Sequence, residues 1–209
     1  MRRLLALIVS VIAPGCSTQP APPVGKAMNL EEAATRLVRI SGKSIRPFAT
    51  RDFGREKNPD ARSALVREAD ARRVLDDLRR ELGPGLLAFI GCTRSLADPP
   101  DKGSEIVVAA GDDQFEILRV AQSDAVNFDM ETEDLVRKLQ EYDAKYGIDI
   151  FHAETDTIEF AFRSMPDDLS AFCQDLYEFC PDIVDQGVGT VEKLEQEVAR
   201  TKAVFLWWD

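Results

Sequence analysis

Two short apolar runs, LLAFIGC at residues 86–92 and EIVVAA at residues 105–110, decide the fold class of this chain. Runs of four to eight apolar residues between turn-forming residues are typical of β-strands. A third run, QFEILRVA at residues 114–121, follows Gly111-Asp112-Asp113, a sequence that predicts a hairpin turn. We therefore expect the middle of the chain to form a sheet.

Helical patterns precede these runs. Asn29 with Glu32 three residues later is typical of a helix start, and the helix is expected to end near Gly42. Residues 43–60 are expected to be an irregular connection, and residues 61–82 one long charged helix. Residues 29–82 are therefore predicted to form a helical N-terminal segment.

Helices and strands alternate after residue 131. The pattern predicts helices at 132–146, after 166 and after Thr190, a strand hairpin at 148–162, and a last apolar strand in AVFLWWD, of the kind found at a sheet centre. The predicted fold is a single α+β domain at residues 83–209, with a mostly antiparallel sheet covered by helices and an N-terminal helical appendage.

The first 16 residues are typical of a bacterial lipoprotein signal peptide. Arg2 and Arg3 precede a ten-residue apolar run that is too short to span a bilayer, and the run leads to APGC, which resembles a lipobox. We expect lipid attachment at Cys16 and a Pro-rich tether at residues 17–28. Ser17 favours the outer membrane, so the expected location is the cell envelope, facing the periplasm.

Composition narrows the classes of partner. The formal net charge is −11, and the acidic residues are concentrated in the second half of the chain. A surface of this sign repels phosphate backbones, which argues against nucleic-acid binding. It suits a basic protein partner.

The cysteines do not indicate a metal site. The chain has four cysteines and one histidine and no Cys-x-x-Cys pair, so we expect no structural zinc and no cofactor. Cys173 and Cys180 lie too far apart on one helix for a disulfide, at a rise of about 10.5 Å. Pairing of Cys92 with either of them is left open.

The densest group of polar residues is CPDIVDQG at residues 180–187. Asp182 and Asp185 lie three residues apart, followed by Gln186 and two glycines. In one interpretation Asp182 caps a new turn and the glycines shape a link to the next helix. In the other, these side chains bind a ligand or a metal ion or perform acid–base chemistry.

This segment, together with the terminal LWWD, resembles a bacterial domain-of-unknown-function family, number 4253, which is marked by a Cys-Pro-Asp motif. The resemblance covers about residues 111–209. It implies no activity.

Two residues outside this segment complete the candidate ligand-binding set. His152 lies near Glu154 and Asp156 and is expected at a hairpin tip, either as a solvated residue or as a general base. Trp207 and Trp208 alternate along the last strand, so one is expected in the core and the other beside Asp182. The candidates are Asp182, Asp185, Gln186, Trp208 and His152.

Two functions are compatible with these patterns. The first is a non-catalytic binding or interaction module at the envelope. The alternative is a hydrolase or metal-dependent enzyme that uses the carboxylates of CPDIVDQG. The sequence contains no catalytic serine motif that would favour the hydrolase.

Overall fold

The computed structural model describes residues 28–50 and 57–209. The predicted signal peptide, Cys16 and nearly all of the predicted tether lie outside the described residues. No helix in these ranges is both long and apolar enough to cross a bilayer.

In the described part of the chain, seven strands form one sheet in the order β1-β2-β4-β3-β5-β6-β7. All neighbours are antiparallel except β3 and β5, which are parallel. The predicted fold class, a single α+β domain with a mostly antiparallel sheet, is confirmed. The strands are β1 (Arg46–Ala49), β2 (Lys57–Val66), β3 (Leu86–Arg94), β4 (Gly103–Ala110), β5 (Ile148–Ala153), β6 (Thr157–Phe162) and β7 (Ala203–Trp207).

Side chains cap the start of α1, α4, α5 and α6. Asn29 and Glu32 form the predicted capping box at the start of α1, and Thr190 accepts the N–H of Lys193 at the start of α6. The helices are α1 (Leu30–Ser41), α2 (Glu68–Arg79), α3 (Glu116–Ala121), η1 (Val126–Phe128), α4 (Thr132–Tyr146), α5 (Leu169–Phe179), η2 (Ile183–Val188) and α6 (Val191–Thr201).

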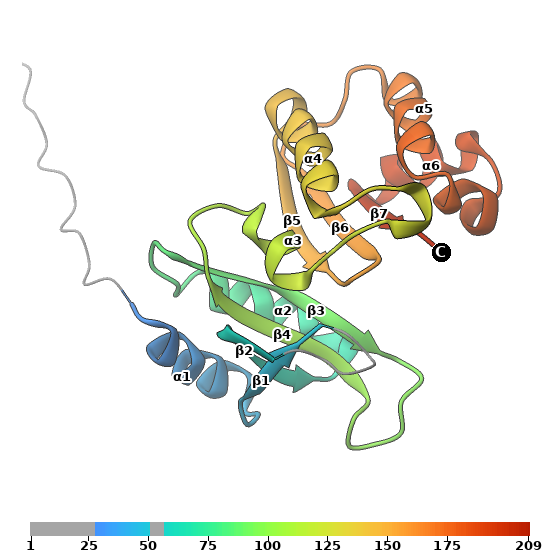
Figure 1. The fold of residues 1–209 in the computed structure, drawn as a ribbon. Coiled ribbons are helices and arrows are strands. Elements are labelled where there is room, and N and C mark those ends of the chain that lie inside the picture. Colours follow the sequence, from blue (N-terminus) through green and yellow to red (C-terminus); the bar gives the residue numbers. More distant parts are fainter. Residues whose placement is uncertain (1–27, 51–56) are drawn as a thin grey trace, which may run out of the picture.

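The helices cover different halves of the sheet on opposite faces (Figure 1). Helices α1 and α2 pack on one face of β2, β4 and β3, where Leu37, Leu75 and Ile106 are fully buried. Helices α3 to α6 pack on the other face, mainly over β5, β6 and β7, around Tyr142 and Phe160. Burial of one such side chain stabilises the fold by roughly 1.5–3 kcal/mol. Among the described residues, α2 reaches only the near part of β5, at Phe151, so most of the α2-side face of β5, β6 and β7 has no helix over it.

Side-chain hydrogen bonds help to join the halves of the sheet. Strands β3 and β5 share only the pair Ile90 and His152. Beside that pair, Arg79 donates to the carbonyl oxygens of Ala88 on β3 and Ile150 on β5, at 2.8 and 2.6 Å. Gln114 accepts the N–H of Ile150 and donates to the carbonyl of Ile148, at 3.0 and 3.2 Å. These side chains replace ladder hydrogen bonds that the diverging strands do not make.

Three predicted elements are wrong. Residues 114–121 form a helix, α3, rather than a strand, because Asp113 accepts the N–H groups of Phe115 and Glu116 and thereby starts the turn. Residues 43–66 contain β1 and β2 rather than an irregular link and the start of a long helix, so segment 29–82 is not purely helical. Strand β7 lies at an edge of the sheet and not at its centre.

The reason for the second error is tertiary. Residues 61–66 of β2 pair in an unbroken antiparallel ladder with β4. Alternate residues of this stretch, Ala64 and Val66, face α1 and α2. Burial between β4 and two helices outweighs the helix propensity of ARSALV, in which Ala, Arg and Leu all favour a helix.

Candidate functional site

An open groove lies on the same sheet face as α1 and α2, beside the strands that these helices cover. Its volume is about 550 Å³. Helix α2 forms one wall, and residues of β3 to β7 form the floor. The lining side chains are Glu68, Ala71, Arg72, Ile90, Thr93, Ser104, His152, Glu154, Thr157, Glu159, Phe205 and Trp207.

A bulge in β5 turns His152 into this groove. The pairing of β5 with β6 shifts between Ile150 and His152, so Phe151 is an extra residue on β5. A bulge of this kind re-aims the side chains that follow it. Phe151 packs on the α2 side of the sheet and His152 lines the groove. The prediction that His152 occupies a hairpin tip is wrong, because it lies within β5 and is buried.

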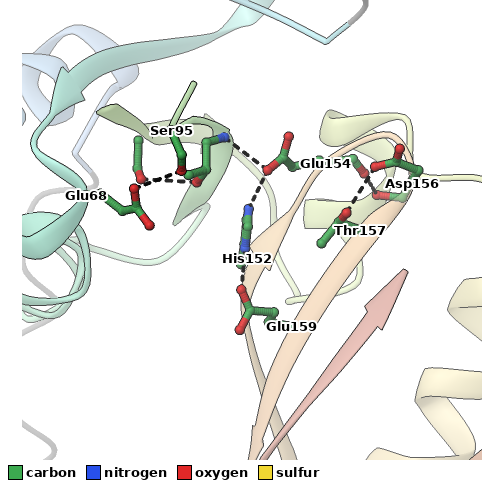
Figure 2. A network of polar contacts seen from close by, with 10 residues as sticks. Glu68, Ser95, His152, Glu154, Asp156, Thr157 and Glu159 are labelled. Atoms are coloured by element: carbon green, nitrogen blue, oxygen red, sulfur yellow. Dashed lines mark hydrogen bonds and ion pairs between the residues drawn. The ribbon is translucent and has the colours of Figure 1, made fainter. Parts of the chain in front are cut away.

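His152 is held between two carboxylates, as Figure 2 shows. Its Nδ1 lies 2.7 Å from Glu159 Oε1, and its Nε2 lies 3.0 Å from Glu154 Oε1. A neutral imidazole has only one N–H, whereas both carboxylates accept hydrogen bonds. The arrangement therefore requires the imidazolium, which donates to both partners.

Electrostatics agree with this assignment. Burial lowers the pKa of His152, but the hydrogen bonds and negative charges of Glu154 and Glu159 outweigh burial and raise this pKa to about 9. Burial raises the pKa of Glu154, and hydrogen bonds from His152, Thr93 and Cys92 outweigh it and lower this pKa. At neutral pH the three side chains carry one net negative charge.

Glu154 also connects the network to β3. The backbone N–H of Thr93 donates to Glu154 Oε1 at 3.0 Å. The Thr93 hydroxyl donates to Ser104 on β4 at 3.1 Å, and Ser95 donates to Glu68 on α2 at 2.9 Å. The carboxylates on the groove floor and the α2 wall are thus fixed by hydrogen bonds (Figure 2).

Aromatic side chains form the apolar part of the groove. Phe205 is 50% exposed, although it is a large apolar residue, and Trp207 is half-buried. On the α2 wall, Arg72 lies with its guanidinium carbon 4.1 Å from the ring centre of Phe151. The same guanidinium forms ion pairs with Asp76 and Asp149. The groove therefore offers aromatic faces next to fixed carboxylates.

The CPDIVDQG segment lies elsewhere and contacts the C-terminal strand. Asp182 is buried; its two carboxylate oxygens accept the side-chain amide of Gln186 at 3.0 Å and the backbone N–H of Asp209 at 2.9 Å. The thiol of Cys180 donates to the carbonyl of Trp207 at 3.1 Å. We call this set of contacts the C-terminal clamp.

The other candidates from the sequence take separate positions. Trp208 is buried against Phe179, with ring centres 5.5 Å apart in an edge-to-face arrangement. Asp185 is exposed and accepts the Tyr177 hydroxyl at 3.0 Å. The structure thus joins Asp182 with Gln186, while Asp185, Trp208 and His152 each bond to other groups. Trp207, and not Trp208, is the tryptophan that lines a groove.

Several groove residues were missed from the sequence. Glu159, Phe205 and Trp207 are the odd-numbered residues of β6 and β7, whose even-numbered neighbours are core. The pattern that could have indicated the groove is one carboxylate and two aromatic residues on the same face of two adjacent strands. That signal needs the pairing of β6 with β7, which the sequence does not reveal.

Two findings concern metals and disulfides. Within residues 28–50 and 57–209, no group of three or more His, Cys, Asp or Glu side chains is placed to hold a metal ion. No disulfide joins Cys92, Cys173 and Cys180. Burial raises the pKa of the Cys173 thiol to about 11 and that of Cys180 to about 12.

Comparison with known proteins returns one match. The family described as Domain of unknown function (DUF4253) matches residues 105–209. No curated protein and no solved structure matches the chain. The matched region begins within β4 and contains the C-terminal clamp, but it lacks β3, which lies between β4 and β5 in the sheet.

Proposed function

This chain belongs to the family Domain of unknown function (DUF4253), and we propose that it is a non-catalytic binding module whose ligand lies in the groove bordered by α2. The observation that carries the proposal is the groove itself. It is a hollow of about 550 Å³ on a sheet face, lined by half-exposed Phe205, half-buried Trp207 and a fixed Glu–His–Glu network. Concave sites with apolar walls and a few oriented polar groups are typical of ligand binding.

The state of His152 supports binding rather than acid–base catalysis. A general base needs a free nitrogen lone pair within reach of a substrate proton. Both ring nitrogens of His152 bond to carboxylates, and its pKa is raised to about 9, so the imidazolium orients Glu154 and Glu159. The carboxylates of Asp182 and Asp185 bond to different partners within the protein. No observation of this kind favours a hydrolase.

Tryptophan fluorescence provides a direct test. The chain has two tryptophans, of which Trp207 lines the groove and Trp208 is core. We would screen the full chain against small ligands and short peptides by thermal shift and follow each hit by fluorescence titration. Saturation at 100 times the Kd adds about 2.7 kcal/mol to the free energy of unfolding, which is easily detected.

Matched variants locate the site. Phe205→Ala removes a half-exposed side chain from the groove, and Val126→Ala removes a 69%-exposed side chain from a hollow beside η1. We expect ligands to lose affinity in Phe205→Ala and to keep it in Val126→Ala. Ligands that lose affinity only in Val126→Ala, or whose affinity changes in neither variant, would contradict the assignment of the groove as the binding site.

We also propose that the module acts at the bacterial cell envelope, held by a lipid on Cys16. The proposal is supported by the basic start, the apolar run and the APGC sequence of residues 1–16. Several acyl chains on one cysteine make a stable anchor, whereas one chain binds only marginally. We expect the full chain to partition into detergent and the Cys16→Ser chain into the aqueous phase. Equal partitioning of both would refute the anchor.

A further inference from the structure

The charges around the groove sum to a negative value. His152 neutralises one of its two carboxylate partners, so the Glu154–His152–Glu159 network keeps one negative charge. Glu68 on the opposite wall bonds to the neutral hydroxyl of Ser95. The positive charge of Arg72 is paired with Asp76 at 3.3 Å, whereas Asp149, 3.7 Å from Arg72, pairs more closely with Arg79 at 2.8 Å. The lining residues Glu68, Glu154 and Glu159 therefore outnumber the two cations, Arg72 and His152. A ligand that complements this groove carries positive charge.

The aromatic residues stand next to these carboxylates. Glu159 on β6 pairs directly with Phe205 on β7, and Thr157 pairs with Trp207. Opposite residues that do not exchange backbone hydrogen bonds have the closest side chains in an antiparallel sheet. A cation above Phe205 or Trp207 is therefore within reach of Glu159. The protein already uses this chemistry on the α2 wall, where Arg72 lies over Phe151.

The edge of β7 indicates how such a ligand is presented. The backbone N–H of Phe162 donates to Lys202, and that of Trp208 donates to Asp156, so even-numbered residues of β7 bond to β6. By alternation, the backbone groups of Ala203, Phe205 and Trp207 point toward the open edge. Thr201 bonds to both backbone groups of Ala203, and Cys180 bonds to the Trp207 carbonyl. The N–H and C=O of Phe205, in the middle, lie at the open edge of the sheet.

We propose that the groove receives arginine or lysine side chains from an extended basic segment of a partner protein, which crosses the β7 edge at Phe205. The proposal rests on the proposed function, because it names the ligand of the same groove. The alkyl stem of the basic side chain lies on Phe205 and Trp207, and its cationic head bonds to Glu159. Backbone hydrogen bonds at Phe205 fix the direction of the segment.

A pair of peptides tests the charge requirement. The probe is an acetylated, amidated pentapeptide in which arginine alternates with serine, so that both arginines lie on one face of an extended chain. Its match carries citrulline, which has the same shape and no charge. Binding to the full chain is measured by calorimetry and by fluorescence, with Trp207→Phe to assign the optical signal.

We expect the arginine peptide to bind at least about tenfold more tightly than the citrulline peptide, and its affinity to fall as salt is raised. Glu159→Gln is expected to weaken the arginine peptide about two- to fivefold and to leave the citrulline peptide unchanged. Glu141→Gln removes the same charge from α4 on the other face of the sheet and should change affinity less than about twofold. The peptide comparison and the salt series use the unmodified chain. Both tests therefore remain valid even if Glu159→Gln destabilises the protein.

Three results would overturn the inference, and they differ in what they say of the proposed function. Equal binding of both peptides, with a Trp207 signal, would refute recognition of the cation and leave the groove as the binding site. Failure of the arginine peptide to bind, while the ligand screen yields hits sensitive to Phe205→Ala, would refute the basic segment alone. A screen without such hits would reject both proposals.

Discussion

The buried imidazolium of His152 makes the stability of this protein depend on pH in a defined window. Its pKa is raised from the ordinary value of 6.5 to about 9 by Glu154 and Glu159, which outweigh the opposing effect of burial. A group whose folded-state pKa is raised stabilises the protein fully below its unfolded-state pKa, and this contribution is lost as the pH rises through the folded-state value. The window therefore runs from about pH 6.5 to about pH 9.

The magnitude follows from linkage. One pKa unit corresponds to about 1.4 kcal/mol, so a shift of this size contributes roughly 3 kcal/mol to the free energy of unfolding at pH 6. The buried thiols of Cys173 and Cys180 also have raised pKa values, but they act only above about pH 8.5–9, where unfolded cysteines begin to ionise. Glu154 has a lowered pKa, so its contribution is lost at acid pH and lies outside this window.

The assay is urea unfolding at several pH values between 6 and 10, for the unmodified chain and for His152→Gln. We expect the free energy of unfolding of the unmodified chain to fall by roughly 3 kcal/mol between pH 6 and 9.5, and that of the variant to fall much less. Because His152 is the only histidine, its ring proton signals in NMR report its pKa directly. A titration midpoint between pH 6 and 7 would refute the doubly bonded imidazolium.

The remaining predictions concern structure. Asp182→Asn places an amide against the backbone N–H of Asp209, so we expect chemical unfolding to show a loss of about 1–3 kcal/mol in the free energy of unfolding. The matched change at an exposed residue, Asp185→Asn, should alter this free energy by no more than about 0.5 kcal/mol. Equal effects of the two variants would contradict the C-terminal clamp. Gln114→Leu leaves the C=O of Ile148 and the N–H of Ile150 without their partner, so urea unfolding should show a loss of about 2 kcal/mol in the free energy of unfolding. An unchanged unfolding midpoint would disprove the role of Gln114 between the sheet halves. A fragment of residues 105–209 lacks β3, which separates β4 from β5, so we expect no cooperative unfolding by circular dichroism; a cooperative transition would show that the family region folds alone.

The family and the fold class could be predicted because their signals are local. CPDIVDQG and LWWD are contiguous motifs, and the family match at residues 105–209 confirms the resemblance that they indicate. The strands at 86–92 and 105–110 and the helix at 132–146 are confirmed because short apolar runs and a 3.6-residue period report burial on one face directly. Residues 114–121 were assigned wrongly because the cap that Asp113 provides was read as a hairpin turn.

The sequence by itself therefore determined the family, the α+β class, the caps of α1 and α6 and the acidic charge of the chain. Only the tertiary structure decided the role of each polar residue. Asp182 binds the backbone of Asp209, 27 residues away, and His152 meets Glu159 only because a bulge shifts the register of β5 on β6. The groove exists because α1 and α2 cover β2, β4 and β3 and reach no farther than Phe151 of β5. Such contacts depend on which strands pair and in which register, and pairing is set by the burial of the whole sheet rather than by the residues next to each site.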